Sequence, residues 1–234
     1  VWTFTTGEFG YELDLKVFIE GPYMGPAMST VLNVLGYLPL GQPYNTAPWW
    51  YQGTEAVTEI PNNDVVEWVL IELRDAVNAS GAGSSTVIAR RAVFLMKDGM
   101  IRDLDGVSLP AFDVPVNDNL FAVIWHRNHL AVMSADPLSL TGDIYSYDFT
   151  DDPAKVYGGA IAHKELSPGV WGMRGGDGNP DGQVGNSDKL DVWNPQSGNS
   201  GYLSGDFSLD GQVNNVDKVD VWVPNSGNGS QVPD

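Results

Sequence analysis

The chain has 234 residues and contains no cysteine. Disulfide bonds, thiol nucleophiles and thiolate metal sites are therefore excluded, so any cross-link that stabilises the fold beyond its core has to be of another kind. Positive charge is also scarce, because 12 Lys and Arg stand against 30 Asp and Glu, which gives a formal net charge of −18. Proteins that bind nucleic acid or anionic membranes need a basic face, so this charge argues against both partners.

Long apolar runs are missing as well, and no stretch resembles a membrane-spanning helix or a signal peptide. Because the chain starts at Val1 and not at Met, we expect that a leader has been removed. No serine nucleophile elbow, glycine-rich phosphate loop or H-E-x-x-H motif is present, and carboxylate pairs such as Glu67 and Glu72 lack an acid–base context. The sequence therefore predicts a protein that is not an enzyme.

The most tempting chemical group is His126-x-x-His129. Side chains alternate along a strand, so two histidines three apart would point to opposite faces unless a turn or bulge separates them. We therefore favour structural histidines over a shared zinc ion or a catalytic role at this place.

What the sequence does contain is a duplicated acidic pattern near its end. Asp177–Asp188 and Asp206–Asp217 are two copies of one 12-residue pattern at a constant offset of 29 residues. The match continues beyond them, since Trp193 corresponds to Trp222 and Pro195 to Pro224. A repeat this regular predicts two copies of one structural unit.

The spacing of oxygen-bearing residues in the repeat predicts two Ca²⁺ ions, because calcium takes six to eight oxygen ligands around a loop with glycine at its sixth position. Gly182 and Gly211 occupy that position, and Val184 and Val213 two places later are expected to pack the loops together. Gly185 and Asn214 would act through water. The predicted ligands are the side chains of Asp177, Asn179, Asp181 and Asp188 with the carbonyl of Gln183, and those of Asp206, Ser208, Asp210 and Asp217 with the carbonyl of Gln212.

These tandem loops, each followed by a short segment, resemble the calcium loops of type I dockerin modules. The resemblance covers about residues 175–228 and implies a small calcium-binding domain, here residues 171–234, that docks on another protein. The segments differ from dockerin helices, because Pro195 and Pro224 should end each helix after about two turns. Asp191 and Asp220 are either extra ligands or helix N-terminal acids.

The remainder of the chain predicts strands. Residues 1–10 form a strand or an arm that pairs with a neighbour. Residues 11–20, 65–74, 86–96, 120–133 and 144–149 alternate or are β-branched between turn signals, which predicts an antiparallel β-sandwich over 11–170, with 165–176 as the link to the tail. Within the Pro-rich stretch 21–63, Trp49, Trp50 and Tyr51 either cover the core or form an interface or sugar-binding platform.

In segments such as Val66–Arg74 and Ile124–Met133, the sandwich also resembles, loosely, domains beside dockerin-like tails in secreted proteins of Bacteroidota-type bacteria, which implies a bacterial cell surface. Together, these features predict a mainly β, non-catalytic, extracellular calcium-binding protein. Its tail would dock on a protein partner, and head-to-tail contacts between identical subunits would make it a scaffold or filament subunit. The alternative is a carbohydrate-binding or adhesin module on a dockerin-type anchor.

Overall fold

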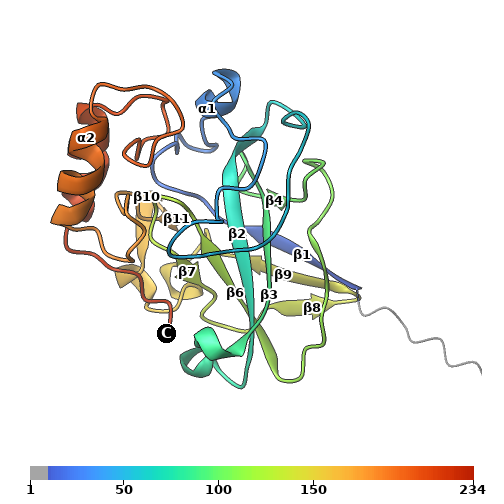
Figure 1. Ribbon diagram of the computed structural model, residues 1–234. Coiled ribbons are helices and arrows are strands. Elements are labelled where there is room, and N and C mark those ends of the chain that lie inside the picture. Colours follow the sequence, from blue (N-terminus) through green and yellow to red (C-terminus); the bar gives the residue numbers. More distant parts are fainter. Residues whose placement is uncertain (1–9) are drawn as a thin grey trace, which may run out of the picture.

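The computed structural model describes residues 10–234, so the predicted strand or arm at residues 1–10 lies outside the described chain except for Gly10. The molecule is mainly β, with two larger sheets, a two-stranded sheet and a helical tail at one end (Figure 1). The first sheet has the order β5-β1-β9-β8 and consists of β1 (Gly10–Lys16), β5 (Ala111–Asp113), β8 (Ser139–Thr141) and β9 (Ile144–Asp148). The second has the order β4-β3-β2-β6-β7 and consists of β2 (Val65–Ala76), β3 (Val87–Met96), β4 (Ile101–Arg102), β6 (Asn119–Trp125) and β7 (Val132–Met133).

The main core lies between these sheets. Strand β1 alternates, so that Leu13 and Leu15 are fully buried and contribute to the same apolar cluster as Ile71 of β2 and Phe94 of β3. The whole of β2 is buried apart from partly exposed Asp75, which confirms the expectation of a strand covered on both faces. Inward-facing side chains of both sheets thus share one core, as in a β-sandwich.

Two features differ from the prediction. β1 and β9 pair in parallel, from Glu12 beside Ile144 to Lys16 beside Asp148, so the sandwich is not wholly antiparallel. The segment assigned as a link forms a hairpin of β10 (His163–Ser167) and β11 (Val170–Met173), which is a two-stranded sheet with a further bridge between Met173 and Ile19. Its alternation is short and its charged residues are typical of a linker, so the sequence does not indicate a hairpin here.

The irregular stretch before β2 is packed over the core. It contains the helical turn α1 (Val31–Val34), and the buried Tyr44 donates a hydrogen bond from its hydroxyl to the carbonyl oxygen of Trp68 at 2.8 Å. The indole of Trp68 donates in turn to the carbonyl of Pro39 at 2.9 Å. Single 3₁₀ turns occupy the connections, namely η1 (Ala79–Gly81), η2 (Ser84–Thr86), η3 (Pro153–Lys155) and η4 (Gly159–Ile161).

The tail contains two short helices, as expected. Each begins with a wide, π-type turn and ends in one α-turn; the first comprises η5 (Asp188–Trp193) and α2 (Asn194–Gln196), the second η6 (Asp217–Trp222) and α3 (Val223–Asn225). Pro195 and Pro224 lack the N–H that would continue the hydrogen-bond ladder, and each helix ends one residue later. None of the helices within residues 10–234 has the length and apolar composition that crossing a bilayer requires.

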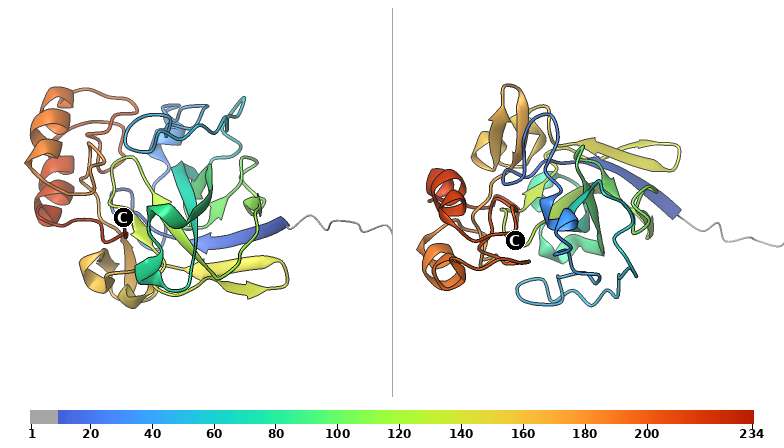
Figure 2. Two further views of the ribbon diagram at one scale, coloured as in Figure 1. Left: turned by 60° about the horizontal axis from the view of Figure 1, so that its bottom comes forward. Right: turned by 90° about the horizontal axis from the view of Figure 1, so that it is seen from above.

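The tail packs on its own sandwich. The views in Figures 1 and 2 place its helices beside the end of the sandwich that carries β10 and β11. A buried polar cluster joins the two parts: Glu67 of β2 accepts hydrogen bonds from Arg127 Nε at 2.9 Å and from the Tyr202 hydroxyl at 2.7 Å. The Arg127 guanidinium lies 4.2 Å from the centre of the Tyr202 ring and donates to the carbonyl of Leu203 at 2.6 Å. The chain end also lies on the sandwich, since Arg74 donates to the carbonyl of Pro233 at 2.6 Å.

The Glu67–Arg127 ion pair provides a first prediction, because its two side chains are 0% and 6% exposed. Arg127→Ala leaves a buried carboxylate without its cation, and we expect a loss of about 3–5 kcal/mol in the free energy of unfolding, measured by urea denaturation. Lys97→Ala is the control, because Lys97 pairs with Asp64 while both side chains are about half exposed, and its loss should cost about 1 kcal/mol or less. Equal losses in the two variants would contradict this account of the junction.

Candidate metal centre

The two repeats form equivalent loops, called loop 1 (177–188) and loop 2 (206–217). The first carboxylate of each loop receives two amide hydrogen bonds across the turn. Asp177 accepts from the amides of Asp181 at 3.1 Å and Gly182 at 3.0 Å. Asp206 accepts from the amides of Asp210 at 3.1 Å and Gly211 at 2.8 Å. Both glycines have left-handed backbone angles, with φ of 83° and 88°, which explains why glycine is needed there.

The last carboxylate closes each loop in the same way. Asp188 accepts from the amides of Asn179 at 3.2 Å and Gly185 at 2.7 Å. Asp217 accepts from the amides of Ser208 and Asn214, both at 2.8 Å. The predicted ligand side chains of each repeat are therefore gathered in one loop, and Gln183 and Gln212, whose carbonyls were predicted as ligands, lie in β-bridges with Gly229 and Ser200.

The loops are interlocked through the segments that follow the helices. In loop 1, Val184 exchanges backbone hydrogen bonds with Gly227 and Asn228, both at 2.8 Å. In loop 2, Val213 exchanges them with Gly198 at 2.8 Å and Asn199 at 2.9 Å. Each loop is thus completed by the chain that follows the other repeat.

The packing between the repeats follows the same symmetry. Val184 and Val213 are both buried in one apolar cluster with Trp193 and Trp222, as expected from their position in the repeat. The Trp193 indole donates to the carbonyl of Asn214 and the Trp222 indole to that of Gly185, both at 2.9 Å. Lys218 lies 4.3 Å from the centre of the Trp193 ring. This cluster holds the loops back to back.

The carboxylates are crowded enough to disfavour their own charge. Burial, together with the charges of Asp188 and Asp181, raises the pKa of Asp177 to about 8. Burial and the neighbouring Asp217 raise the pKa of Asp206 to about 7, although the Arg127 guanidinium acts in the opposite direction. Burial also raises the pKa of Asp188 and of Asp217. A nearby cation would relieve this cost.

The donor set of each loop fits a hard divalent cation, because it consists of carboxylate, amide or hydroxyl, and backbone oxygens only. Within residues 10–234 no three His, Asp or Glu side chains converge as a complete metal cluster. The carboxylates instead accept hydrogen bonds from the amides of their own loop. Asp191 and Asp220, named as extra ligand candidates, are exposed on the helices.

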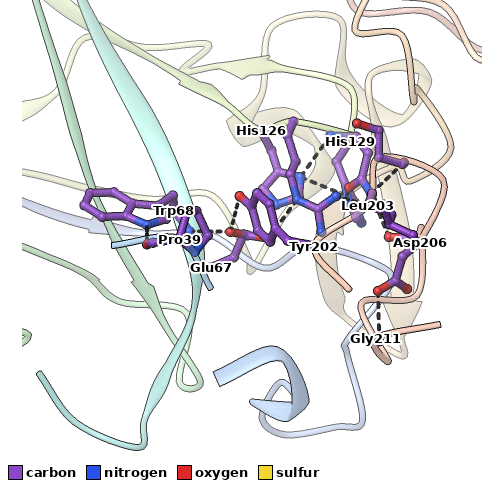
Figure 3. Close-up of polar contacts among 12 residues, drawn as sticks. Pro39, Glu67, Trp68, His126, His129, Tyr202, Leu203, Asp206 and Gly211 are labelled. Atoms are coloured by element: carbon purple, nitrogen blue, oxygen red, sulfur yellow. Dashed lines mark hydrogen bonds and ion pairs between the residues drawn. The ribbon is translucent and has the colours of Figure 1, made fainter. Parts of the chain in front are cut away.

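The histidine pair lies in a turn, which brings the two rings together. The chain leaves β6 at Trp125, so His126 and His129 lie in a loop and their rings meet edge to face, with 3.1 Å between their Nδ1 atoms (Figure 3). Both are buried, and His129 Nε2 accepts a hydrogen bond from the amide of Gly21 at 3.1 Å. Burial and the charges of Arg127 and Lys164 lower the pKa of His129 to about 3. The pair therefore belongs to the buried junction.

The aromatic cluster does not form a single platform. Trp49 is buried at 8% exposure and packs edge to face on Tyr44, whereas Trp50 is 65% exposed. Tyr51 is half-buried, and its hydroxyl donates to Glu55 at 2.5 Å and lies 3.1 Å from the carbonyl oxygen of Arg90. Of the two alternatives for these rings, Trp49 therefore covers the core, whereas Trp50 stays exposed.

Trp49 instead lines a cleft between the sandwich and the tail. The cleft measures about 430 Å³, and its walls include Trp49 and Trp125 on the sandwich side and Asp181 and Gln183 of loop 1 on the other. Trp50, the residue after Trp49, has a left-handed backbone (φ 43°), a conformation that costs energy for a bulky residue.

Sequence reasoning missed the residues that join the tail to the sandwich. Asn128 donates from Nδ2 to the carbonyls of Ser204 at 3.1 Å and Asp206 at 2.7 Å. Figure 3 shows Glu67, Tyr202 and Leu203 gathered between β2 and the tail. The available signal was Glu67 itself, because an acidic residue inside an apolar strand has to find a buried partner.

Comparisons with known proteins do not identify a family for this chain. No family model matches the chain, and no curated protein matches it. Among solved structures, a chain of a type II cohesin–X–dockerin complex from Acetivibrio cellulolyticus, an N-terminal interface mutant, aligns with a TM-score of 0.42 and 12% identity. The alignment covers 94% of this chain and 96% of that chain. A TM-score this low does not establish a shared fold, so nothing said of that complex is carried over to this protein.

His163 provides a prediction for acid stability. Burial and the charge of Arg174 lower its pKa from 6.5 to about 3, and both ring nitrogens lack a partner among the described residues. Unfolding therefore takes up a proton here between pH 6.5 and about 3, so stability is complete above this window and falls as the pH falls through it.

His163→Met removes this titration. We expect the free energy of unfolding at pH 7 to change by about 1.5 kcal/mol or less, because a similar volume is kept and no hydrogen bond is lost. As the pH falls through this window, the free energy of unfolding of the variant should decrease by about 1.4 kcal/mol less per pH unit than that of the wild type. All other titrating groups are shared, so the difference between the two denaturation series isolates His163, and parallel series would contradict the assignment.

Proposed function

We propose that this protein is a non-catalytic, extracellular calcium-binding structural or interaction protein whose two tail loops each take one Ca²⁺. The observation that carries the proposal is the equivalent hydrogen bonding of two loops that present oxygen ligands at the same positions. The raised pKa values of Asp177 and Asp206 support it, since a bound cation would supply the charge that these carboxylates lack.

The calcium proposal is tested by counting ions. Isothermal titration calorimetry of the wild type should give two Ca²⁺ per chain, whereas Asp181→Ala and Asp210→Ala should each give one, because each removes a charged ligand from one loop. Asp191→Ala is the control, since this exposed helix residue lies outside the loop, and it should keep two. A stoichiometry that stays at two in both loop variants would refute the ligand assignment.

The surface that supports an interaction role is the outer face of the tail helices. Leu190 is 54% exposed and Val219, its equivalent 29 residues later, is 53% exposed. Val216 and Val223 add exposed apolar side chains to the second helix. Because loop 2 is already docked on the sandwich of the same chain, we infer that this helix face, and not the docked face, contacts a protein partner, either another protein or an identical subunit.

Self-association is tested by light scattering with calcium and then with excess chelator. If identical subunits are the partner, the mass should rise with protein concentration in calcium and fall to that of one chain after chelation. Val219→Lys should abolish the increase, because it places a charge on the apolar face, whereas Val107→Lys should not, since Val107 is 74% exposed on the sandwich. A single-chain mass in every condition would exclude the filament and leave a different protein as the partner.

The second candidate function is carbohydrate binding by the sandwich. It is favoured by the exposed, backbone-strained Trp50 beside the cleft lined by Trp49 and Trp125, because exposed indole faces stack on sugar rings. Trp50→Ala would then abolish retardation in gels containing β-glucan, mannan or xylan while leaving the calcium stoichiometry unchanged. Wild-type migration that no polysaccharide retards would remove this candidate.

A further inference from the structure

The two loops have equivalent internal bonds but different surroundings. In loop 2, Asp206, Phe207, Ser208 and Leu209 are all buried, and Leu209, which is 1% exposed, belongs to the core of the sandwich. In loop 1, the equivalent positions after Gly178 are more open: Asn179 and Pro180 are half-buried. The fifth position, Asp181 or Asp210, is exposed in both. The asymmetry therefore lies in what surrounds the ligands, and not in the ligands.

The sandwich contacts loop 2 through its backbone. Asn128 donates to the carbonyl of Asp206 at 2.7 Å, and a Cβ atom on Gly21 would lie 2.0 Å from the carbonyl oxygen of Phe207. A Cβ on the turn glycine of loop 2, Gly211, would meet Leu35 at 2.8 Å, whereas the nearest atom to one on Gly182 is Ser230 Cβ at 3.9 Å. The sandwich thus packs against the ligand-bearing residues of loop 2 themselves, whereas at loop 1 it bonds to Gly176, which precedes the first predicted ligand.

We propose that calcium binding to loop 2 and docking of the tail on the sandwich are one coupled equilibrium, whereas loop 1 takes its ion independently of docking. This inference rests on the calcium binding proposed above. Asp206 presents its carboxylate to the predicted ion and its carbonyl to Asn128, and Leu209 enters the sandwich core between the predicted ligands Ser208 and Asp210. Moving either partner away releases the restraints on the other.

Coupling of this kind is reciprocal. If docking raises the calcium affinity of loop 2 by some factor, calcium must strengthen docking by the same factor. Arg127 lies close to Asp206, but its charge is paired with Glu67, so an ion in loop 2 does not meet an uncompensated positive charge. Two experiments can therefore approach the same coupling from opposite sides.

The first experiment changes the sandwich and measures each loop. Gly21→Ala introduces a methyl group against Phe207 without altering any predicted ligand, and Gly41→Ala is the control, because a Cβ there has nothing within 4 Å. The amides of Gly182 and Gly211 donate to the first carboxylate of their own loops, so their NMR signals report each loop separately during a Ca²⁺ titration.

The expected result is that Gly21→Ala weakens calcium binding about tenfold at the Gly211 signal and leaves binding at the Gly182 signal within about twofold. Gly41→Ala should leave both affinities unchanged. An intact Gly182 response also demonstrates that the variant has kept the fold of the tail.

The second experiment changes the loops and measures docking. The amide of Gly176 donates to the carbonyl of Asn128 at 3.0 Å and that of Leu130 to the carbonyl of Arg174 at 2.8 Å, so both amides report the junction. In saturating calcium, Asp210→Ala should accelerate hydrogen exchange at these two amides about tenfold, whereas the matched Asp181→Ala should leave it within about twofold.

The outcomes separate this inference from the calcium proposal. If neither glycine signal of the wild type responds to calcium, the calcium proposal itself fails. If both respond, but Gly21→Ala affects them equally or not at all, or Asp181→Ala accelerates exchange as much as Asp210→Ala does, the coupling is overturned while calcium binding stands.

Discussion

The carboxylate of Glu67 is the constraint on which the arrangement of the molecule depends. It is fully buried in the central strand of an apolar sheet, where an unpaired charge would be strongly destabilising. Its partners are Arg127, from the loop after β6, and Tyr202, from the tail. The buried carboxylate is therefore satisfied from both parts of the molecule, and its hydroxyl partner is present only when the tail is in place.

The loop aspartates are a second group of acidic side chains, and unlike Glu67 they have no cationic partner of their own among the described residues. The loop aspartates face one another and the amides of their own loops, and among residues 10–234 the nearby cation, Arg127, is already paired with Glu67. Crowding of like charges at a fixed backbone is destabilising unless an external cation compensates it. The contrast between the internally paired Glu67 and these aspartates is the physical basis for proposing metal binding at the loops and a structural role for the junction.

Sequence patterns predicted features that depend on local spacing. The loops with Gly182 and Gly211, the helices ended by Pro195 and Pro224, and the doubly covered strand β2 all follow from short-range rules, and the structure agrees with them. The parallel pairing of β1 with β9 could not be predicted, because the partners are more than a hundred residues apart and nothing in either strand specifies direction. The sequence also left open whether Trp49 covers the core or stays exposed, because its contact with Tyr44 forms only after folding.

The interlocked closure of the loops has a consequence for the order in which the protein is made. Loop 1 is translated first, yet the strand partners of Val184 are Gly227 and Asn228, near the end of the described chain. Loop 2 needs only Gly198 and Asn199, which have already left the ribosome when its own residues appear. Vectorial synthesis thus permits the second loop to close before the first, because the first repeat cannot be completed until the segment after the second repeat has emerged.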